Sequence, residues 1–202
     1  MKDLLVLAAD QDAEFLLKAL LEKISIVEKI SSIDFEIIRH PQRDAGVATD
    51  AVEFVRPYIN DYRYLMIIFD YEGSGKETRT KNDIELDMEN QLNINGWPDR
   101  CACITFFPEL ESWLWVHHQH LHDILDWFGN EDIYKWLETS GYVFTGNKPA
   151  RPKESFEAAL KKQKLPRSSS LYSSLAQKAS YQQCIDPSFN KFLNTLKKWF
   201  IR

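Results

Sequence analysis

Two carboxylates stand one residue apart at the end of an apolar run. Asp70 and Glu72 follow Ile67–Phe69, and a turn containing Gly73 and Gly75 comes next. Residues two apart on an extended segment point to the same side, so both carboxylates can face one site. Clustered carboxylates repel each other unless a cation joins them, and hard oxygen ligands suit Mg²⁺ or Mn²⁺. Such a metal positions phosphate and activates water, so this stretch predicts metal-dependent chemistry.

Three other acids also follow apolar runs. Asp10 ends the first run, and Glu109 and Glu111 come just after the run that ends at Phe107. We expect Asp10, Asp70, Glu72 and Glu109 to bind the metal, with Glu111 as a further ligand or base. Ordinary explanations stay open, because acids are favoured in a first helical turn, Asp caps helices, and Asp-rich turns are common.

These acids need a parallel sheet to bring them together. Short apolar runs alternate with amphipathic helical patterns, which is typical of parallel strands with helices on both faces. The carboxyl ends of such strands share one edge, where ligands bind. Asp50 is expected to cap a helix that Pro57 disturbs, and Pro108 is expected to open the helix after the fourth strand. The predicted strands are Leu4–Asp10, Ile33–His40, Tyr64–Asp70 and Cys101–Phe107.

The pattern changes after about residue 128. We predict an α/β core over 1–128 and a basic, mostly helical extension over 129–202 that packs on it. The expected helices of this extension are Asp132–Glu138, Glu154–Lys162, Leu171–Ala179 and Pro187–Phe200.

Composition indicates an ordinary globular protein. The 202 residues are 44% apolar and 27% charged, which is the usual balance for such proteins. The beginning of the chain is too short and too acidic for a signal peptide, and no apolar run reaches the ~20 residues of a membrane span. We expect a cytoplasmic protein without membrane contact. Cys101, Cys103 and Cys184 match no disulfide or zinc pattern, so we expect buried, reduced thiols.

Charge is distributed unevenly along the chain. Residues 148–202 hold twelve Lys and Arg and three acids, a net charge of +9, whereas the whole chain has −5. This basic segment either meets phosphates of DNA or RNA or packs on the acidic part. The candidates for phosphate binding are Lys148, Arg151, Lys153, Arg167 and Lys178.

Other motifs are incomplete. Gly73–Lys76 has the look of a phosphate loop but lacks the spacing and the following Ser or Thr. His118 and His122 have the spacing of a zinc pair, but no further ligand stands near them, so His117, His118, His120 and His122 are expected to be solvated at a helix end.

Six Trp in 202 residues are many, and some of them are candidates for a partner surface. Trp113 is expected in the core, and the place of Trp115 is left open. Trp199 is expected to pack inward from a terminal helix. The cluster considered for a partner is Trp113, Trp115, Trp127, Phe128, Tyr134 and Trp136.

Three stretches together resemble a known family. They are Asp10–Glu14, Asp70–Gly73 and Pro108–Leu114, and they are similar to Toprim-like bacterial proteins, including an accessory protein of methylation-associated phage-defence systems. Stretches 148–154, 167–172 and 184–200 are similar to that group too, so the resemblance covers most of the chain.

The resemblance implies a Toprim-like, Rossmann-type fold and Mg²⁺-dependent processing of nucleic acid. Toprim domains carry Glu after the first strand and Asp-x-Asp after the third. Asp10 takes the place of that Glu, and Asp70 and Glu72 those of the two Asp. Two of the three ligands therefore differ by a methylene. Mg²⁺ often keeps waters that absorb such differences, but catalysis is sensitive to ~1 Å misplacement.

Three functions follow from these observations. The first is a Mg²⁺-dependent nuclease of antiviral defence. The second is a catalytically degenerate module that docks on a larger defence ATPase, methyltransferase or nuclease. The third is metal-independent binding of DNA or RNA by the basic segment.

Overall fold

The computed structural model describes the whole chain except residues 29, 116–117, 128–130, 179–183, 185 and 202. Four parallel strands form its main sheet, in the order β2-β1-β3-β4. The prediction of a parallel four-stranded α/β fold is confirmed. The strands are β1 (Lys2–Ala8), β2 (Phe35–Arg39), β3 (Tyr62–Asp70) and β4 (Cys101–Phe106).

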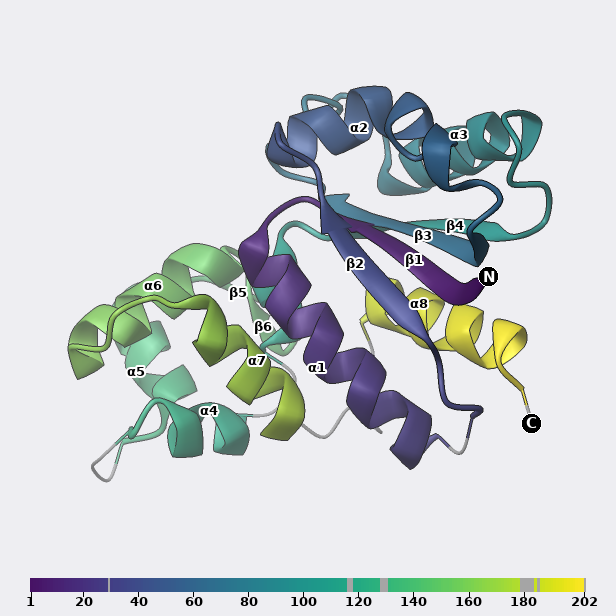
Figure 1. Ribbon diagram of the computed structural model, residues 1–202. Helices are drawn as coiled ribbons and strands as arrows, with labels where there is room; N and C mark the ends of the chain where they lie inside the picture. The colour runs from purple at the N-terminus through teal and green to yellow at the C-terminus, as the bar shows by residue number, and fades with distance from the viewer. Residues whose placement is uncertain (29, 116–117, 128–130, 179–183, 185, 202) are drawn as a thin grey trace.

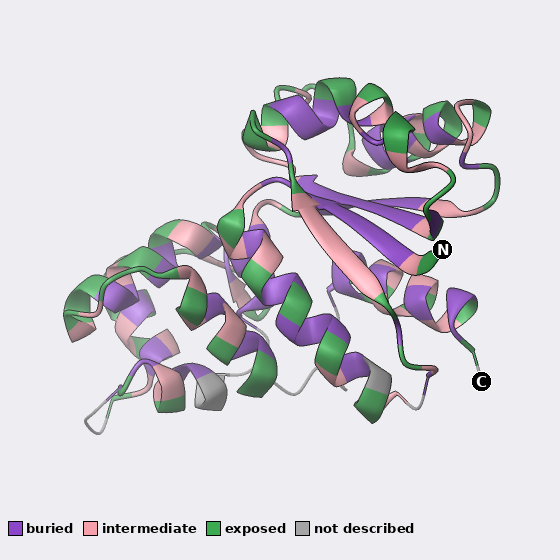
Figure 2. Cartoon of the chain, viewed as in Figure 1, coloured by how far each residue is buried: buried purple, intermediate pink, exposed green. Residues whose placement is uncertain are grey.

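The inner strands are buried on both faces. Leu4–Ala8 and Leu65–Phe69 are nearly continuous apolar runs with no exposed residue, as expected for strands covered by helices on each side. Strand β2 lies at an edge and is only half-buried, as Figure 2 shows.

Helices form a layer on each face of this sheet (Figure 1). Helices α2 (Arg43–Phe54) and α3 (Lys81–Ile94) cover one face, and α1 (Gln11–Val27) and α8 (Pro187–Trp199) cover the other. Each layer has its own cluster of buried apolar side chains. The sheet therefore separates two hydrophobic cores. The helices cover its faces, so the ends of its strands are where a ligand could bind.

The extension is helical and packs beside α1. Helix α7 lies along α1, and α6 packs on the 3₁₀ helix η2 (Leu110–Trp113). The bounds of the four helices predicted here agree with the structure within one to two residues, apart from Ala179, which lies outside the described residues. Helix α4 and the β5-β6 hairpin were not predicted. The remaining elements are η1 (Arg56–Tyr58), α4 (His118–Ile124), α5 (Ile133–Thr139), β5 (Phe144–Thr145), β6 (Lys148–Pro149), α6 (Pro152–Gln163) and α7 (Ser169–Lys178).

The prediction that Asp50 caps a helix is wrong. Helix α2 begins at Arg43, so Asp50 lies inside it, and the helix ends at Phe54. No capping side chain marks the true start, because Gln42 occupies the N-cap position and makes no side-chain hydrogen bond there. In the structure Gly46 is helical and buried, and it lies against the ring of His40. Pro57 stands in η1 beyond the helix end, as its ring requires.

The prediction that Pro108 opens a helix is also wrong. Pro108 and Glu109 precede η2, and Glu109 is extended, with φ −145°. The carbonyl of Pro108 accepts a hydrogen bond from the Glu72 amide at 3.0 Å, so this segment continues alongside the chain that follows β3.

Aromatic side chains join the extension to the sheet. Trp113 is fully buried and its ring packs against Phe189 and Phe192 of α8 at centroid distances of 5.1 and 5.3 Å. Tyr64 of β3 stacks on Trp199 at 4.6 Å. The core position of Trp113 and the inward packing of Trp199 are confirmed.

The aromatic cluster considered for a partner is largely internal. Trp115 is fully buried, and its indole N–H donates to the Pro152 carbonyl at 3.0 Å. Trp127 is buried too, and Trp136 packs against it at 5.2 Å. Phe128 lies outside the described residues. These rings therefore offer little surface to another protein.

In the part of the chain that the structure describes, no helix is long and apolar enough to cross a membrane. Cys103 and Cys184 are buried and Cys101 is half-buried, and all three are unbridged thiols.

Candidate functional site at the carboxyl edge of the sheet

The strand order creates a natural place for a ligand. The chain passes from β1 outward to β2, then returns across β1 to β3 and continues to β4. In open α/β sheets, ligands bind at such a switch point, beyond the carboxyl ends of the two central strands. Asp10 follows β1 and Asp70 ends β3, so the two carboxylates flank this point.

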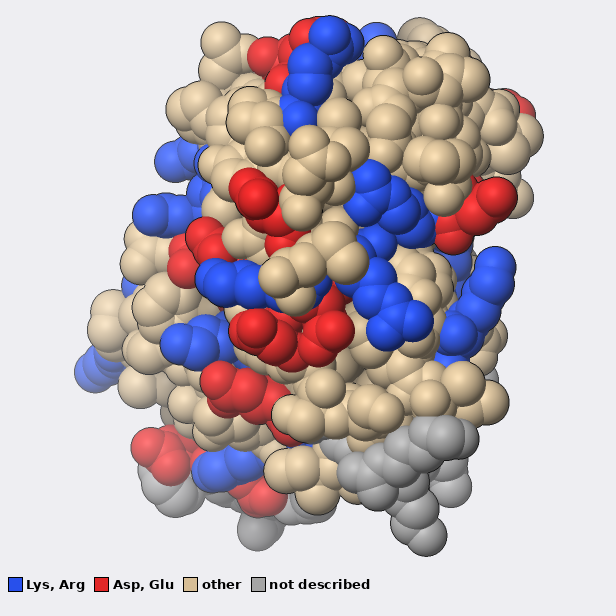
Figure 3. Space-filling model, turned by 45° about the vertical axis from the view of Figure 1, so that its right-hand side comes forward, with Lys and Arg blue, Asp and Glu red and all other residues tan. Residues whose placement is uncertain are grey.

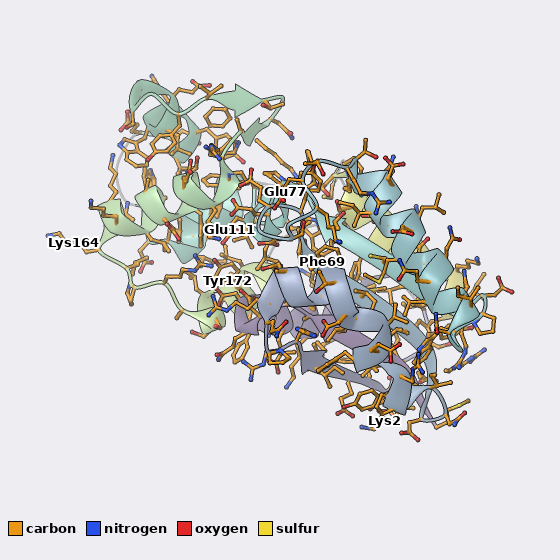
Figure 4. All side chains as sticks on the ribbon, turned by 90° about the horizontal axis from the view of Figure 1, so that it is seen from above. Lys2, Phe69, Glu77, Glu111, Lys164 and Tyr172 are labelled. Atoms are coloured by element: carbon orange, nitrogen blue, oxygen red, sulfur yellow. The ribbon has the colours of Figure 1, made fainter. Side chains whose placement is uncertain are left out.

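A cavity of about 460 Å³ opens there. Five acids line it: Asp10, Asp12, Asp44, Asp70 and Glu111. Arg43, Lys153 and Arg167 line it as well, together with Ser169. The side chains come from the end of β3, from the starts of α1, α2, α6 and α7, from η2, and from the segment before α7. Figure 4 shows Phe69, Glu111 and Tyr172 close to one another in the middle of the molecule.

Backbone amides orient three of the acids. The Oδ1 atom of Asp10 accepts from the Ala13 amide at 2.9 Å and so caps α1. Oδ1 of Asp44 accepts from the Asp70 amide at 2.8 Å, and Oδ1 of Asp70 accepts from the Leu110 amide at 2.9 Å. For Asp10 and Asp70, the second oxygen has no hydrogen-bond partner among the described residues, which leaves it for a ligand in the cavity.

The acids make one another harder to ionise. Burial raises the pKa of Asp70 well above the usual range, and the charges of Asp44, Glu111 and Asp10 raise it further. Asp70 as a residue is half-buried because the cavity reaches it, but protein atoms surround most of its carboxyl group. Burial and the charge of Asp10 also raise the pKa of Asp44. A cation in the cavity would relieve this repulsion.

Glu111 lies deepest in this group and is 1% exposed. The Tyr172 hydroxyl donates to its Oε1 at 2.6 Å, and an Arg167 nitrogen lies 3.3 Å from the same atom. Burial raises the pKa of Glu111 despite these partners. Glu111 is thus held rigidly beside Asp70, in a position for a base or a water-holding group.

Two of the three cations that line the cavity, Arg167 and Lys153, are paired with acids. Arg167 donates to Asp12 at 2.8 Å and to Glu157 at 2.7 Å, and its guanidinium lies 5.5 Å from the centre of the Tyr172 ring. Lys153 donates to Glu109 at 3.2 Å. Burial acts to lower the pKa of Lys153, but Glu109, Glu111 and Asp70 raise it overall, so the lysine stays charged beside the acids.

Not every predicted site residue reaches the cavity. Asp10, Asp70 and Glu111 line it, while Glu109 contacts it through Lys153. Glu72 is not among the lining residues; its side chain is 42% exposed and lies 3.9 Å from Arg151. The backbone turns after Asp70, so two residues of one short motif separate.

Of the residues predicted to bind phosphate, some line the cavity and others lie away from it. Lys153 and Arg167 line the cavity, and Arg151 lies beside Glu72. Lys148 instead donates to Asp186 at 2.8 Å, and Lys178 is exposed in the last turn of α7.

Sequence reasoning missed Asp44. It follows β2 as Asp10 follows β1, so the rule that gathers acids at the carboxyl edge also applies to it. The misplaced start of α2 hid it. Tyr172 and Ser169 were missed too; each lies about sixty residues or more from the acids that it contacts, and no local pattern marks such a contact.

The histidine cluster lies away from this site. Nε2 of His122 accepts from the Ile133 amide at 3.1 Å and stands 3.4 Å from Asp132. His117 lies outside the described residues, and so do the side chains of His118 and His120. The predictions for these three residues therefore remain predictions.

The donor set suits a hard cation. Within the described ranges, no three His, Cys, Asp or Glu side chains already have the spacing of a closed metal site. The carboxylates of Asp10, Asp44 and Asp70 nevertheless line one cavity. Mg²⁺ is commonly held by one or two carboxylates with water completing its octahedron, so an open carboxylate cavity fits it.

Comparison of the chain with protein-family models, with curated proteins and with solved structures found no match. The chemistry of this protein is therefore inferred from the cavity itself.

Proposed function

We propose that this protein is a Toprim-like, Mg²⁺-dependent enzyme that processes nucleic acid, of the nuclease type, and that it acts in antiviral defence. The observation that carries the chemistry is the group of Asp10, Asp44 and Asp70 around the switch point, with raised pKa values at Asp44 and Asp70. The place in defence rests on the sequence resemblance alone.

The residues have distinct roles in this proposal. Asp10, Asp44 and Asp70 hold the cation, which when bound polarises a phosphoryl oxygen and lowers the pKa of water. Lys153 and Arg167 bind the phosphate, since both line the same cavity. Glu111, held by Tyr172, orients or deprotonates the attacking water.

Metal binding comes first in the test. Thermal shift and calorimetry with Mg²⁺ and Mn²⁺ are measured for wild type, Asp70→Asn and Asp44→Asn. Asn keeps an oxygen for the backbone amide while losing the charge. We expect added metal to raise the Tm of wild type, because a ligand that binds the folded state stabilises it. The Tm of each variant should be nearly the same with and without metal.

Asp61→Asn is the matched control. Asp61 is exposed and lies at the amino end of β3, far along the strand from Asp70, so this variant should respond to metal as wild type does. Wild type with Mg²⁺ or Mn²⁺ is then incubated with single- and double-stranded DNA and RNA. Absence of a metal response in wild type, or an equal response in Asp70→Asn, contradicts the proposal.

A second candidate is the degenerate module that docks on a larger defence protein. Two observations favour it: Glu72 stands outside the cavity, and Arg167 is already paired with Asp12, Glu111 and Glu157. This candidate predicts that wild type binds metal but leaves every nucleic acid intact, both alone and with its partner.

A further inference from the structure

A second cavity adjoins the acidic one. It has a volume of about 570 Å³ and lies along the carboxyl end of β2, where residues 37–41 form one wall and the start of α1 forms another. The two cavities therefore belong to one groove, which crosses the carboxyl ends of β1, β2 and β3. The residues that line both are Ala9, Asp10, Gln11 and Arg43.

This second cavity, called the β2 groove below, is large enough for a nucleotide. Small-ligand pockets usually have volumes of about 300–1,000 Å³. Ile37 and Ile38 are half-buried and give the β2 groove an apolar side, while Gln11 and Arg43 offer hydrogen-bond donors. Such a mixed lining suits a ligand that has both a charged group and less polar parts.

Arg43 lies where the two cavities meet. Its side chain makes no hydrogen bond and no ion pair with the residues that the structure describes, although five acids line the acidic cavity beside it. Its guanidinium therefore keeps its charge and its donors for a ligand. The other cations that line the groove are paired: Arg167 with Asp12, Lys153 with Glu109, and Arg39 with Glu14 at 3.0 Å.

The backbone of Arg43 supports a role for this side chain. Its φ is +53°, in the left-handed region that glycine and asparagine adopt at less cost than arginine does. Residues held in such conformations cluster at functional sites. A ligand for the guanidinium gives a physical reason for an arginine at this position.

Arg43 reaches the groove from the side opposite to the other two cations of the acidic cavity. It begins α2, which covers one face of the sheet, whereas Lys153 and Arg167 belong to the extension, which packs beside α1 on the other face (Figure 1). Asp10 and Asp70 come from strand ends between these layers. A phosphate held by Lys153 and Arg167 therefore leaves Arg43 for a different phosphate.

We propose that Arg43 binds the phosphate next to the one at the metal site, and that the β2 groove holds the nucleotide attached to it. The inference rests on the proposed function and names its substrate class, a polynucleotide strand with consecutive phosphates rather than a mononucleotide. A guanidinium group binds two phosphate oxygens through parallel hydrogen bonds, so arginine is well suited to this position.

Short ligands test the inference without cleavage. NMR titration in Ca²⁺, which takes oxygen ligands as Mg²⁺ does, compares thymidine 5′-monophosphate with 5′-phosphorylated dithymidylate, which has a second phosphate. We expect wild type to bind the dinucleotide about tenfold more tightly or better, as a charge-assisted hydrogen bond allows. Arg43→Gln should lose this preference and bind the mononucleotide as wild type does, whereas Arg43→Lys should keep part of the preference.

Two further variants separate contact from folding and from overall charge. Arg43→Asn suits the left-handed backbone, so its Tm should be no lower than that of wild type while the preference is lost. Arg63 is exposed near the amino end of β3, at the opposite edge of the sheet. Arg63→Gln removes the same charge and should keep the preference of wild type.

A wild type without the preference overturns the inference, and so does an Arg43→Gln variant that keeps it or that weakens both ligands equally. The proposed function survives each of these results if the mononucleotide binds wild type only with metal and does not bind Asp70→Asn. If wild type binds neither metal nor nucleotide, both proposals fail.

Discussion

Asp70 is the residue on which the site depends. Its amide donates to Asp44, its carboxylate accepts from Leu110, and its charge is opposed by Asp44, Glu111 and Asp10. A carboxyl group whose pKa is raised by folding binds protons better in the folded than in the unfolded state. Ionised Asp70 therefore lowers the stability of the metal-free protein.

This predicts a pH dependence with a definite sign. In EDTA, the free energy of unfolding contributed by Asp70, Asp44 and Glu111 should fall as pH rises above the ordinary carboxyl pKa near 4, until the raised folded-state pKa values are passed. Urea unfolding from pH 5 to pH 8 measures it.

Asp70→Asn should flatten this dependence and raise the Tm of the metal-free protein at pH 8. Asp61→Asn should leave the dependence as in wild type. A variant less stable than wild type at pH 8 in EDTA would show that Asp70 stabilises the fold instead.

Helix α2 shows how one small residue places an element. A Cβ atom on Gly46 would lie 2.2 Å from Nδ1 of His40 and 2.6 Å from Cβ of Gln42. The close approach brings the start of α2 to the end of β2, and with it Asp44 to the cavity. Gly in an ordinary helix interior would be improved by Ala.

We predict the opposite for Gly46→Ala. Overpacking at this contact should lower the free energy of unfolding by about 1–3 kcal/mol, measured by urea unfolding. His40→Ala in the same chain should recover part of the loss, because it removes the nearest atoms. A neutral or stabilising Gly46→Ala would mean that α2 shifts freely.

Helix α3 closes the free edge of β4. Glu85 is 3% exposed, and its Oε1 accepts from the Thr105 amide at 2.8 Å, while Lys81 and Lys191 bind its two oxygens. Glu89 accepts from the Cys103 amide at 2.9 Å. Two carboxylates thus replace a neighbouring strand, which protects the edge from pairing with another chain.

Removing Glu85 should be costly. Glu85→Ala leaves the Lys81 ammonium and the Thr105 amide and hydroxyl without their acceptor, while Lys191 keeps Glu89. We expect a loss of about 3–5 kcal/mol. Asp87→Ala removes an exposed carboxylate of α3 that pairs with Arg79 in the loop before this helix, and it should cost under about 1 kcal/mol. Similar losses for both variants would contradict this role of Glu85. Thermal and urea unfolding measure both.

At the scale of the molecule, the uneven charge of the sequence is balanced by contact. Lys153 pairs with Glu109, Arg167 with Asp12, and Lys197 with Glu28. Acidic and basic side chains consequently lie next to each other on the face shown in Figure 3. The basic segment completes the site from within and covers the sheet.

The extension is therefore expected to be needed for folding. A fragment of residues 1–128 lacks Phe189, Phe192 and Trp199, which pack on Trp113 and Tyr64. We expect it to lack a cooperative thermal transition and near-UV circular dichroism. A cooperative transition in the fragment would show that 1–128 is an independent domain.

The sequence by itself determined the parallel sheet and two of the acids at the carboxyl edge of that sheet. Apolar runs long enough for strands, with helical patterns between them, admit few arrangements other than a parallel sheet, and the strand ends then bring Asp10 and Asp70 together. This inference is local, because each run is read within a few neighbouring residues.

Only the tertiary structure decided which acids share the cavity. Glu72 leaves it because the chain turns after Asp70, while Asp44 enters it because Gly46 lets α2 start against His40. Arg167 contacts Asp12, which is 155 residues away in the sequence, and Tyr172 contacts Glu111, which is 61 residues away. Such contacts depend on how α7 packs on α1, and packing at that separation leaves no periodic trace in the sequence.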